Sequence, residues 1–350
     1  GHGIWNQGGT MNVEIDGGTF NANGNTWGGI TLINQWADFN GYDYGYSYDN
    51  LVIKNGSQVT MSNNGTYGYN NGNLTISDST FTAENNAARD NIACSNLEAV
   101  NSTINVNGAQ GTGYNGVYWV FGNGIDVGGN EIYIDGTTIN AAGNCRSGIY
   151  LGYAVGDFSE IGEVQALAVI KNSQMNVSGN GKSGLDIINT ANIDATTINA
   201  SSNGLAGIHF NNGSNIITEF DLNSHAFYDP YNSSDPNGTS VLNNTTVNLS
   251  GNNIGIVLSR ELNANDSVIV NTGNGSQGIK YEMGETAVYK ENGNTIAAIS
   301  STGAEIEGDN EEQLTLIEAG SLQGSRDNMT GTYEFNGVKA DDEVYAAPIN

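Results

Sequence analysis

Short apolar runs, separated by Gly and Asn, recur about every 22 residues along the chain. Each repeat has a first apolar position and, 9 to 13 residues later, a second one that usually follows glycine. The distance from the second position of one repeat to the first position of the next varies far more, from 12 to 39 residues. This pattern predicts a solenoid in which all the longer loops emerge at one corner of the coil. The first positions are Phe20, Val59, Phe81, Ile104, Ile139, Met175, Ile198 and Val247, and the second are Ile30, Tyr69, Ile92, Val117, Ile149, Leu185, Ile208 and Ile256.

The repeats also carry short alternating runs such as Leu74-Thr75-Ile76 and Ile132-Tyr133-Ile134. These runs are rich in β-branched residues and too short for helices, so they are predicted to be strands. One coil of such strands cannot bury its own apolar side chains. Coils stacked about 4.8 Å apart would align equivalent side chains and close a continuous core.

Asparagine occupies one fixed position, five residues after the first apolar residue, in seven of the eight repeats. Only Ala109 interrupts the series. Asparagine tolerates left-handed backbone angles, and stacked amides can bond one another, so we expect a ladder of Asn side chains at one bend. Its members are Asn25, Asn64, Asn86, Asn144, Asn180, Asn203 and Asn252.

The coil length, the three short strands per coil and the Asn register resemble those of the pectate-lyase-like superfamily. The resemblance covers roughly residues 1–300 and implies an all-β fold, a right-handed single-stranded parallel β-helix with long loops on one side. Residues 301–350 are expected to form a C-terminal β cap, the end of the helix and the start of a linker. The segment from Leu314 to Gly324 resembles the end of bacterial adhesin and autotransporter-type passenger domains. The superfamily contains lyases, hydrolases, tailspikes and adhesins, so the fold alone does not decide the function.

The net charge of the chain limits the classes of molecule that it is expected to bind. Ten basic residues against 37 acidic ones give a formal charge of −27, which argues against binding nucleic acid or an anionic membrane surface. No apolar run of 18 residues is present, so membrane insertion is not expected. Gly3-Ile4 matches Gly29-Ile30, so the chain begins within a repeat and is expected to be part of a longer polypeptide.

The cysteines and histidines do not suggest a metal site. Cys94 and Cys145 stand at different phases of the repeat and are expected to be free, mostly buried thiols; a disulfide in an exported protein is the alternative. The histidines His2, His209 and His225 are scattered, which does not fit zinc.

Four long connections, at about residues 34–50, 118–131, 150–167 and 211–240, carry 16 of the 30 aromatic residues, 12 acidic residues and no Lys or Arg. Tyr and Trp offer sugars a flat apolar surface with a polar tip, so these loops are predicted to bind a glycan. Packing of the aromatic side chains onto the coil is the alternative. The expected ligand-binding residues are Trp36, Tyr42, Tyr44, Tyr46, Tyr118, Trp119, Tyr153, Tyr228 and Tyr231.

The acidic loop residues suggest Ca²⁺ as a cofactor, because Ca²⁺ takes six to eight oxygen ligands. No EF-hand spacing is present, and a solvated acidic surface is the alternative. The expected ligands are Asp38, Asp43, Asp49, Asp221 and Asp229.

Enzymatic motifs are sparse. Gly1-His2-Gly3 matches one of four motifs typical of polygalacturonase-like enzymes, and the other three are missing from the chain. Arg146, at a predicted turn, is interpreted as a surface charge. A glycosidase needs only two carboxylates at a suitable separation, so loop acids such as Asp43, Asp126, Asp157 and Asp221 remain candidates.

The sequence therefore favours a bacterial cell-surface, extracellular adhesin-type β-helix without catalytic residues. Its expected partner is a neutral glycan or a host or plant glycoprotein, because no cation in the loops can pair with an acidic polymer. The alternative is a polysaccharide-degrading enzyme, either a glycoside hydrolase or a pectate-lyase-like lyase.

Overall fold

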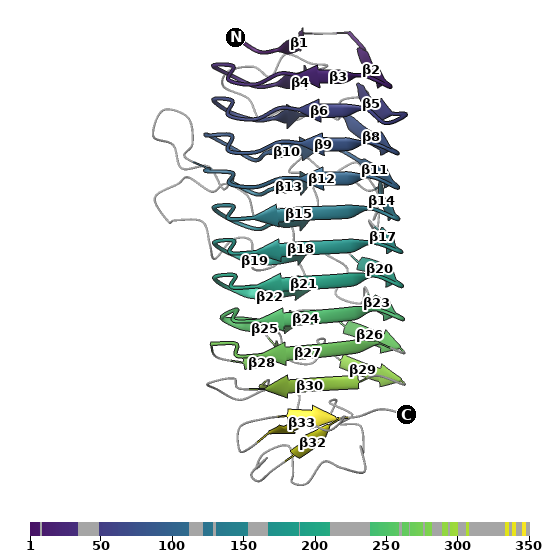
Figure 1. The fold of residues 1–350 in the computed structure, drawn as a ribbon, viewed down its shortest axis with the longest axis vertical. Helices are drawn as coiled ribbons and strands as arrows, with labels where there is room; N and C mark the ends of the chain where they lie inside the picture. Colours follow the sequence, from purple (N-terminus) through teal and green to yellow (C-terminus); the bar gives the residue numbers. More distant parts are fainter. Residues whose placement is uncertain are drawn as a thin grey trace, which may run out of the picture.

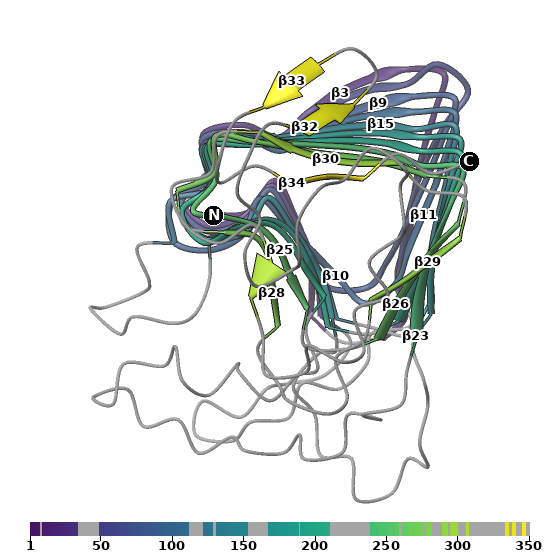
Figure 2. The ribbon, with the colours of Figure 1, turned by 90° about the horizontal axis from the view of Figure 1, so that it is seen from below.

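A computed structural model describes residues 1–7, 9–33, 49–111, 122–128, 131–152, 167–188, 190–210, 239–258, 261–265, 267–275, 277–281, 289–292, 295–299, 306–307, 333–335, 338–340 and 345–347. Each coil contributes one strand to each of three sheets, and neighbouring coils pair in parallel (Figure 1). The chain is thus a right-handed parallel β-helix, as its repeat predicts. Seen along the helix axis, the three sheets enclose one core (Figure 2).

The strands of the three sheets alternate along the chain. Sheet A contains β1 (Ile4–Gln7), β4 (Ile30–Ile33), β7 (Tyr69–Asn70), β10 (Ile92–Cys94), β13 (Ile125–Val127), β16 (Ile149–Leu151), β19 (Ser183–Ile187), β22 (Ala206–Phe210), β25 (Ile254–Leu258), β28 (Gln277–Tyr281) and β31 (Ile306–Glu307). Sheet B contains β2 (Asn12–Asp16), β5 (Asn50–Lys54), β8 (Asn73–Ser77), β11 (Leu97–Val100), β14 (Glu131–Asp135), β17 (Leu167–Lys171), β20 (Thr190–Asp194), β23 (Thr239–Asn243), β26 (Glu261–Asn265) and β29 (Tyr289–Asn292). Sheet C contains β3 (Thr19–Asn21), β6 (Gln58–Thr60), β9 (Thr80–Thr82), β12 (Thr103–Asn105), β15 (Thr138–Ala142), β18 (Gln174–Ser178), β21 (Thr197–Ser201), β24 (Thr246–Ser250), β27 (Val268–Thr272), β30 (Thr295–Ile299) and β34 (Tyr345–Ala347).

Two antiparallel pairings occur near the C-terminus. Strand β34 pairs with β30, and β32 (Tyr333–Phe335) forms a hairpin with β33 (Val338–Ala340). Every other strand pairing in the described residues is parallel.

The apolar positions stack as the repeat predicts. In sheet C the first positions pair from coil to coil, and all except the partly buried Phe20 lie in the core. In sheet A the second positions pair likewise through Ile30, Tyr69 and Ile92.

The second position of the fourth repeat belongs to Ile125 and not to Val117, because Ile125 pairs with Ile92 on one side and Ile149 on the other; Val117 itself lies outside the described residues. The insertion in this coil therefore lies between β12 of sheet C and β13 of sheet A. The other long connections run from sheet A to sheet B, so the extra length leaves the coil at two corners rather than one.

The predicted Asn ladder is present at the bend between sheets C and A. Asn180 illustrates its bonding: Oδ1 accepts from the backbone N–H of Asn144 (3.1 Å) and from Asn144 Nδ2 (3.0 Å). Its Nδ2 donates to the carbonyl of Ala141 (3.1 Å) and to Asn203 Oδ1 (3.0 Å). Because every polar atom of this buried amide has a partner, the ladder joins adjacent coils without leaving unsatisfied groups. It also continues beyond the predicted members to Asn274.

Where Ala109 interrupts the ladder, Asn91 fills the gap. Asn91 Oδ1 accepts from Asn86 Nδ2 (2.8 Å), and Asn91 Nδ2 donates to Asn144 Oδ1 (3.3 Å). Equivalent positions of other coils hold glycine. A Cβ at Gly148, for example, would lie 2.8 Å from Asn180 Nδ2 in the next coil. Asn91 fits because the next coil carries the small Ala109 instead of a ladder amide.

One expectation about this bend needs correction. The left-handed backbone belongs to the residue before each ladder amide, as at Asn63 (φ 59°), Gly143 (φ 64°) and Gly179 (φ 62°), and not to the ladder residue. The ladder amides are free of that strain and serve only to bond the coils together.

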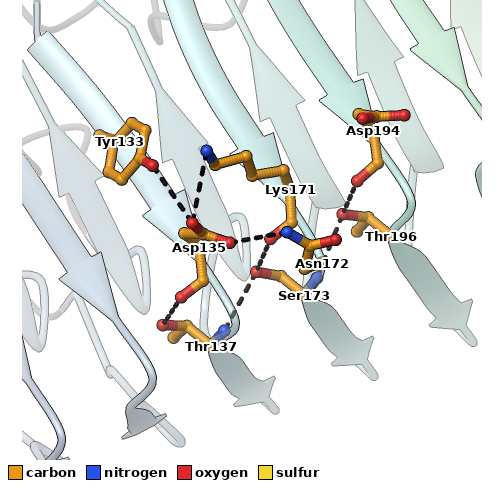
Figure 3. A network of polar contacts seen from close by, with 8 residues as sticks. All are labelled: Tyr133, Asp135, Thr137, Lys171, Asn172, Ser173, Asp194 and Thr196. Atoms are coloured by element: carbon orange, nitrogen blue, oxygen red, sulfur yellow. Dashed lines mark hydrogen bonds and ion pairs between the residues drawn. The ribbon is translucent and has the colours of Figure 1, made fainter.

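A second polar ladder, which the sequence did not suggest, lies at the bend between sheets B and C (Figure 3). Thr137 donates its backbone N–H to Ser173 Oγ (3.1 Å), and Ser173 donates its own to Thr196 Oγ1 (3.3 Å). Each hydroxyl in turn donates to a carbonyl two residues earlier, such as that of Lys171 (2.6 Å). Its signal in the sequence is a Ser or Thr at one fixed position per coil, a residue type too common to stand out.

Removing a ladder amide should cost far more stability than removing a surface amide. Asn180→Leu leaves the partners in both adjacent coils unsatisfied, and it should lower the free energy of unfolding by roughly 2–5 kcal/mol. Asn248→Leu is the control, because exposed Asn248 bonds only Asn199 Oδ1 among the contacts described (2.9 Å), and it should cost less than about 1 kcal/mol. Urea unfolding of both variants measures the difference, and equal losses would contradict the ladder's role.

Asn91 and Ala109 should compensate for each other. Asn91→Gly breaks the ladder and Ala109→Asn crowds Asn91, so each single change should cost about 1–3 kcal/mol. The double variant restores a ladder amide beneath a glycine and should return to within about 1 kcal/mol of the wild type. Denaturant unfolding of all four proteins gives the coupling energy, and additive losses would show that the two positions are independent.

Candidate functional site

The aromatic glycan-binding residues expected from the sequence, Trp36, Tyr42, Tyr44, Tyr46, Tyr118, Trp119, Tyr153, Tyr228 and Tyr231, lie outside the described residues. So do the expected Ca²⁺ ligands Asp38, Asp43, Asp221 and Asp229. These assignments remain predictions.

Asp49 is described, and it is fully buried. Its carboxylate accepts hydrogen bonds from the backbone N–H of Met11 (2.6 Å) and from Asn6 Nδ2 (2.8 Å). Both carboxylate oxygens therefore hold the first two coils together. Within the described ranges no cluster of three His, Cys, Asp or Glu residues could hold a metal ion.

A different set of ionisable residues stands on the outer face of sheet A. Asp126, Tyr150, Asp186 and His209 occupy equivalent positions on β13, β16, β19 and β22 and pair in register. Their chain neighbours lie in the core, and side chains alternate along a strand, so these four face outward. We call these four residues the sheet A row.

Half of the sheet A row, Asp186 and His209, is buried although the row faces away from the core. All five residues of β19 and all five of β22 are buried, whereas strands of sheets B and C alternate between buried and more exposed positions. Asp186 is 0% exposed and His209 only 3%. Asp126 and Tyr150 keep partial access to solvent. Ionisable groups are seldom buried unless they are paired or functional.

Asp186 is held in its ionised form. Burial alone would raise the pKa of its carboxyl, but Lys182 and His209 outweigh that effect and lower the pKa below the usual value for Asp. Lys182 Nζ lies 3.1 Å from Asp186 Oδ2, and His209 Nδ1 lies 3.6 Å from Asp186 Oδ1. Asp186 is therefore a carboxylate at neutral pH.

Asp126 has the opposite tendency. Burial, followed by the charge of Asp90, raises the pKa of the Asp126 carboxyl to about 8, against weaker opposing effects from Arg146 and Asn123. Although part of its surface reaches solvent, the carboxyl lies among buried groups, and Asn123 Nδ2 donates to its Oδ2 (3.2 Å). At neutral pH Asp126 therefore carries a proton.

Asp90 is the second acid of this corner. Its Oδ1 accepts from the backbone N–H groups of Gly122 (3.0 Å) and Asn123 (2.7 Å). Burial still raises the pKa of its carboxyl, despite these bonds and the nearby Arg146 and Arg89. Asn123 thus contacts both acids. Arg146, interpreted from the sequence as a surface charge, instead contributes to the electrostatics of the row.

Both cysteines in the structure are free, as predicted. Cys94 is buried, but Cys145 is exposed, which corrects the expectation that both thiols are mostly buried. Cys145 directly follows the ladder residue Asn144 at a turn, where the side chain points away from the core.

Sequence reasoning missed the sheet A row for an identifiable reason. Its signal is a Gly–aliphatic pair followed by a polar residue, as in Gly184-Leu185-Asp186 and Gly207-Ile208-His209. The misplaced core position at Val117 left Asp126 in a loop instead of on β13, so its alignment with Asp186 was hidden.

Comparisons of the chain with protein-family models, with curated proteins and with solved structures found no match. In the described part of the chain, no helix is long and apolar enough to span a membrane.

Asp126 should weaken the fold as the pH rises. Between about pH 4, where an Asp in the unfolded chain titrates, and about pH 8, the folded protein holds a proton that the unfolded chain releases. Stability from this group is therefore lost with rising pH. Asp126→Asn should become progressively more stable than the wild type across this range, as measured by urea unfolding at a series of pH values.

Asp135→Asn is the matched control with the opposite sign. Its hydrogen bond from Asn172 and its contact with Lys171 lower the pKa of the Asp135 carboxyl, so its contribution is present above the pKa of unfolded Asp and is lost at acid pH. A stability difference for Asp126→Asn that does not change with pH would contradict the assignment of the proton.

Proposed function

We propose that the protein is a glycoside hydrolase, with Asp126 as general acid and Asp186 as general base. The observation that carries this proposal is that Asp126 and Asp186 stand on one face of one sheet, among groups that move their pKa values in opposite directions. Hydrolysis of a glycoside requires one protonated carboxyl to donate to the leaving oxygen and one carboxylate to act on the other side of the sugar. Pairs whose surroundings move their pKa values apart identify such roles.

The spacing of the two acids also supports hydrolysis. Asp126 and Asp186 stand on β13 and β19, with β16 between them, so their backbones are about 9.6 Å apart. Inverting glycosidases hold their two carboxyls about 6.5–9.5 Å apart, which leaves room for a water molecule. A backbone separation close to the upper end of that range is compatible with this geometry. A sugar between the acids would lie over Tyr150 of β16.

The chemical steps follow from the protonation states. Asp126 donates its proton to the glycosidic oxygen as the bond from that oxygen to the anomeric carbon breaks. Asp186 accepts a proton from water as the water oxygen bonds to the same carbon from the opposite face. Lys182 and His209 keep Asp186 ionised, while burial and Asp90 keep Asp126 protonated.

This proposal favours the enzymatic alternative over the adhesin-type role expected from the sequence. The reason is that a purely adhesive surface has no need for two acids, one buried and one partly buried, whose surroundings favour opposite protonation states. Glycan retention by Trp36 and Trp119, and an extracellular setting at a bacterial surface, remain predictions that are compatible with hydrolysis.

Hydrolysis can be tested on a panel of xylan, mannan, β-glucan and polygalacturonate. The wild type should release new reducing ends, and proton NMR should show inverted anomers at the first time points. Asp126→Asn and Asp186→Asn should each lower kcat by about 10²–10⁴, the usual contribution of a general acid or base. The rate should fall as the pH rises through about 8, where Asp126 loses its proton, and should fall on the acid side only below the ordinary pKa of Asp.

The matched control is Asp194→Asn, a partly exposed acid on sheet B whose variant should cleave at the wild-type rate. Retention of activity in both Asp126→Asn and Asp186→Asn, or the absence of new reducing ends across the whole panel, would overturn the proposal.

A further inference from the structure

Two serine hydroxyls beside the sheet A row have no hydrogen-bond partner among the residues that the structure describes. Ser147 and Ser183 are both 0% exposed, and the Oγ atom of each is unbonded. Within the described ranges the other fully buried hydroxyls have partners. Ser173 Oγ, for example, donates to the carbonyl of Lys171 (2.6 Å) and accepts from the N–H of Thr137 (3.1 Å). The two unbonded hydroxyls are therefore not a general property of the coil.

The register places both serines next to the proposed acids. The N–H of Gly148 donates to the carbonyl of Ser183 (2.9 Å), so the two serines are equivalent residues of adjacent coils. Ser147 follows Asn123 in the same series, because its N–H donates to Asn123 Oδ1 (3.1 Å). Since the side chain of Asn123 reaches Asp126, this series runs along the same outer face as the sheet A row.

Leaving two hydroxyls buried and unbonded costs free energy, and folded proteins seldom do so. A fold that needed only packing at these positions could use alanine, as it does at Ala206, the residue that pairs with Ser183 in the next coil. Each hydroxyl can both donate and accept a hydrogen bond, as a sugar hydroxyl can. Their chemistry thus matches a neutral polyhydroxyl ligand.

We propose, building on the proposed function, that Ser147 and Ser183 form a hydroxyl-binding subsite for the sugar held between Asp126 and Asp186. Ser147 is on the coil of β16, which lies between the two acids, and Ser183 is on the coil of Asp186. The two hydroxyls bond ring hydroxyls of that sugar and fix its position relative to the acids. They are positioning residues and take no part in proton transfer.

The test measures binding and stability together. Cellohexaose, xylohexaose, mannohexaose and hexagalacturonate are titrated calorimetrically into Asp126→Asn, so that no probe is cleaved. The probe that binds most tightly is then titrated into the same protein carrying Ser147→Ala, Ser183→Ala or both. Each single change should weaken binding roughly three- to tenfold, and the double change by more than about tenfold. Urea midpoints should stay the same or rise, because no internal hydrogen bond is lost.

Ser173→Ala is the matched control and should behave in the opposite way, lowering the urea midpoint and leaving binding unchanged. If Ser147→Ala and Ser183→Ala lower stability as Ser173→Ala does and leave binding unchanged, the hydroxyls serve the fold and the subsite is wrong. The subsite proposal is also overturned if none of the four probes binds. If the probes bind through the serines while the wild type cleaves none of them, hydrolysis fails and the subsite stands.

Discussion

Coil-to-coil bonding by buried amides is the constraint on which the rest of this structure depends. Each ladder Asn must meet the amide of the next coil, so every coil has to bend at the same place. Glycine at Gly124, Gly148, Gly184 and Gly207, before an inward-facing apolar residue of sheet A, follows from this, because a Cβ there would lie 2.8–3.0 Å from the ladder amide of the next coil. Asn91 and Ala109 are the exception that fits this rule. Asn91 stands where other coils hold glycine, and its amide takes the place of the ladder amide that is missing at Ala109.

The fixed register of the coils also determines where each residue lies in space. Residues at equivalent places in successive coils must lie about 4.8 Å apart, whatever their distance in the sequence. Asp126 and Asp186 are 60 positions apart in the sequence, with a long connection between them, yet they stand two strands apart. The fold therefore holds two acids at a set distance, while their different neighbours, Asp90 for one and Lys182 for the other, set opposite protonation states.

The inward-facing half of the coil was predictable from sequence, and the outward-facing half was not. Residues such as Ile139 and Asn180 repeat because core packing and amide bonding impose the same demand on every coil. On sheet C the outward Asn140, Asn176 and Asn199 also repeat and bond from coil to coil. The outward positions of sheet A carry no such demand, so Asp126, Tyr150 and His209 share no residue type and form no visible repeat. The error at Val117 has the same origin, since an aliphatic residue near the right spacing satisfied the pattern as well as Ile125 did.

The location of the sheet A row within the stack is itself informative. Its strands, β13 to β22, have complete coils on both sides, and each coil interacts mainly with its neighbours. Buried acids and unbonded hydroxyls lower the stability of the coils that contain them. In the coils of β16 to β22 the Asn ladder and the Ser/Thr ladder are both continuous, and at β13 Asn91 bridges the gap that Ala109 leaves, so two sets of satisfied bonds offset the strain of the outer face. A solenoid can therefore hold a destabilising polar surface in its middle, where coils on both sides restrain it. A terminal coil, with a neighbour on one side only, could not hold such a surface in place.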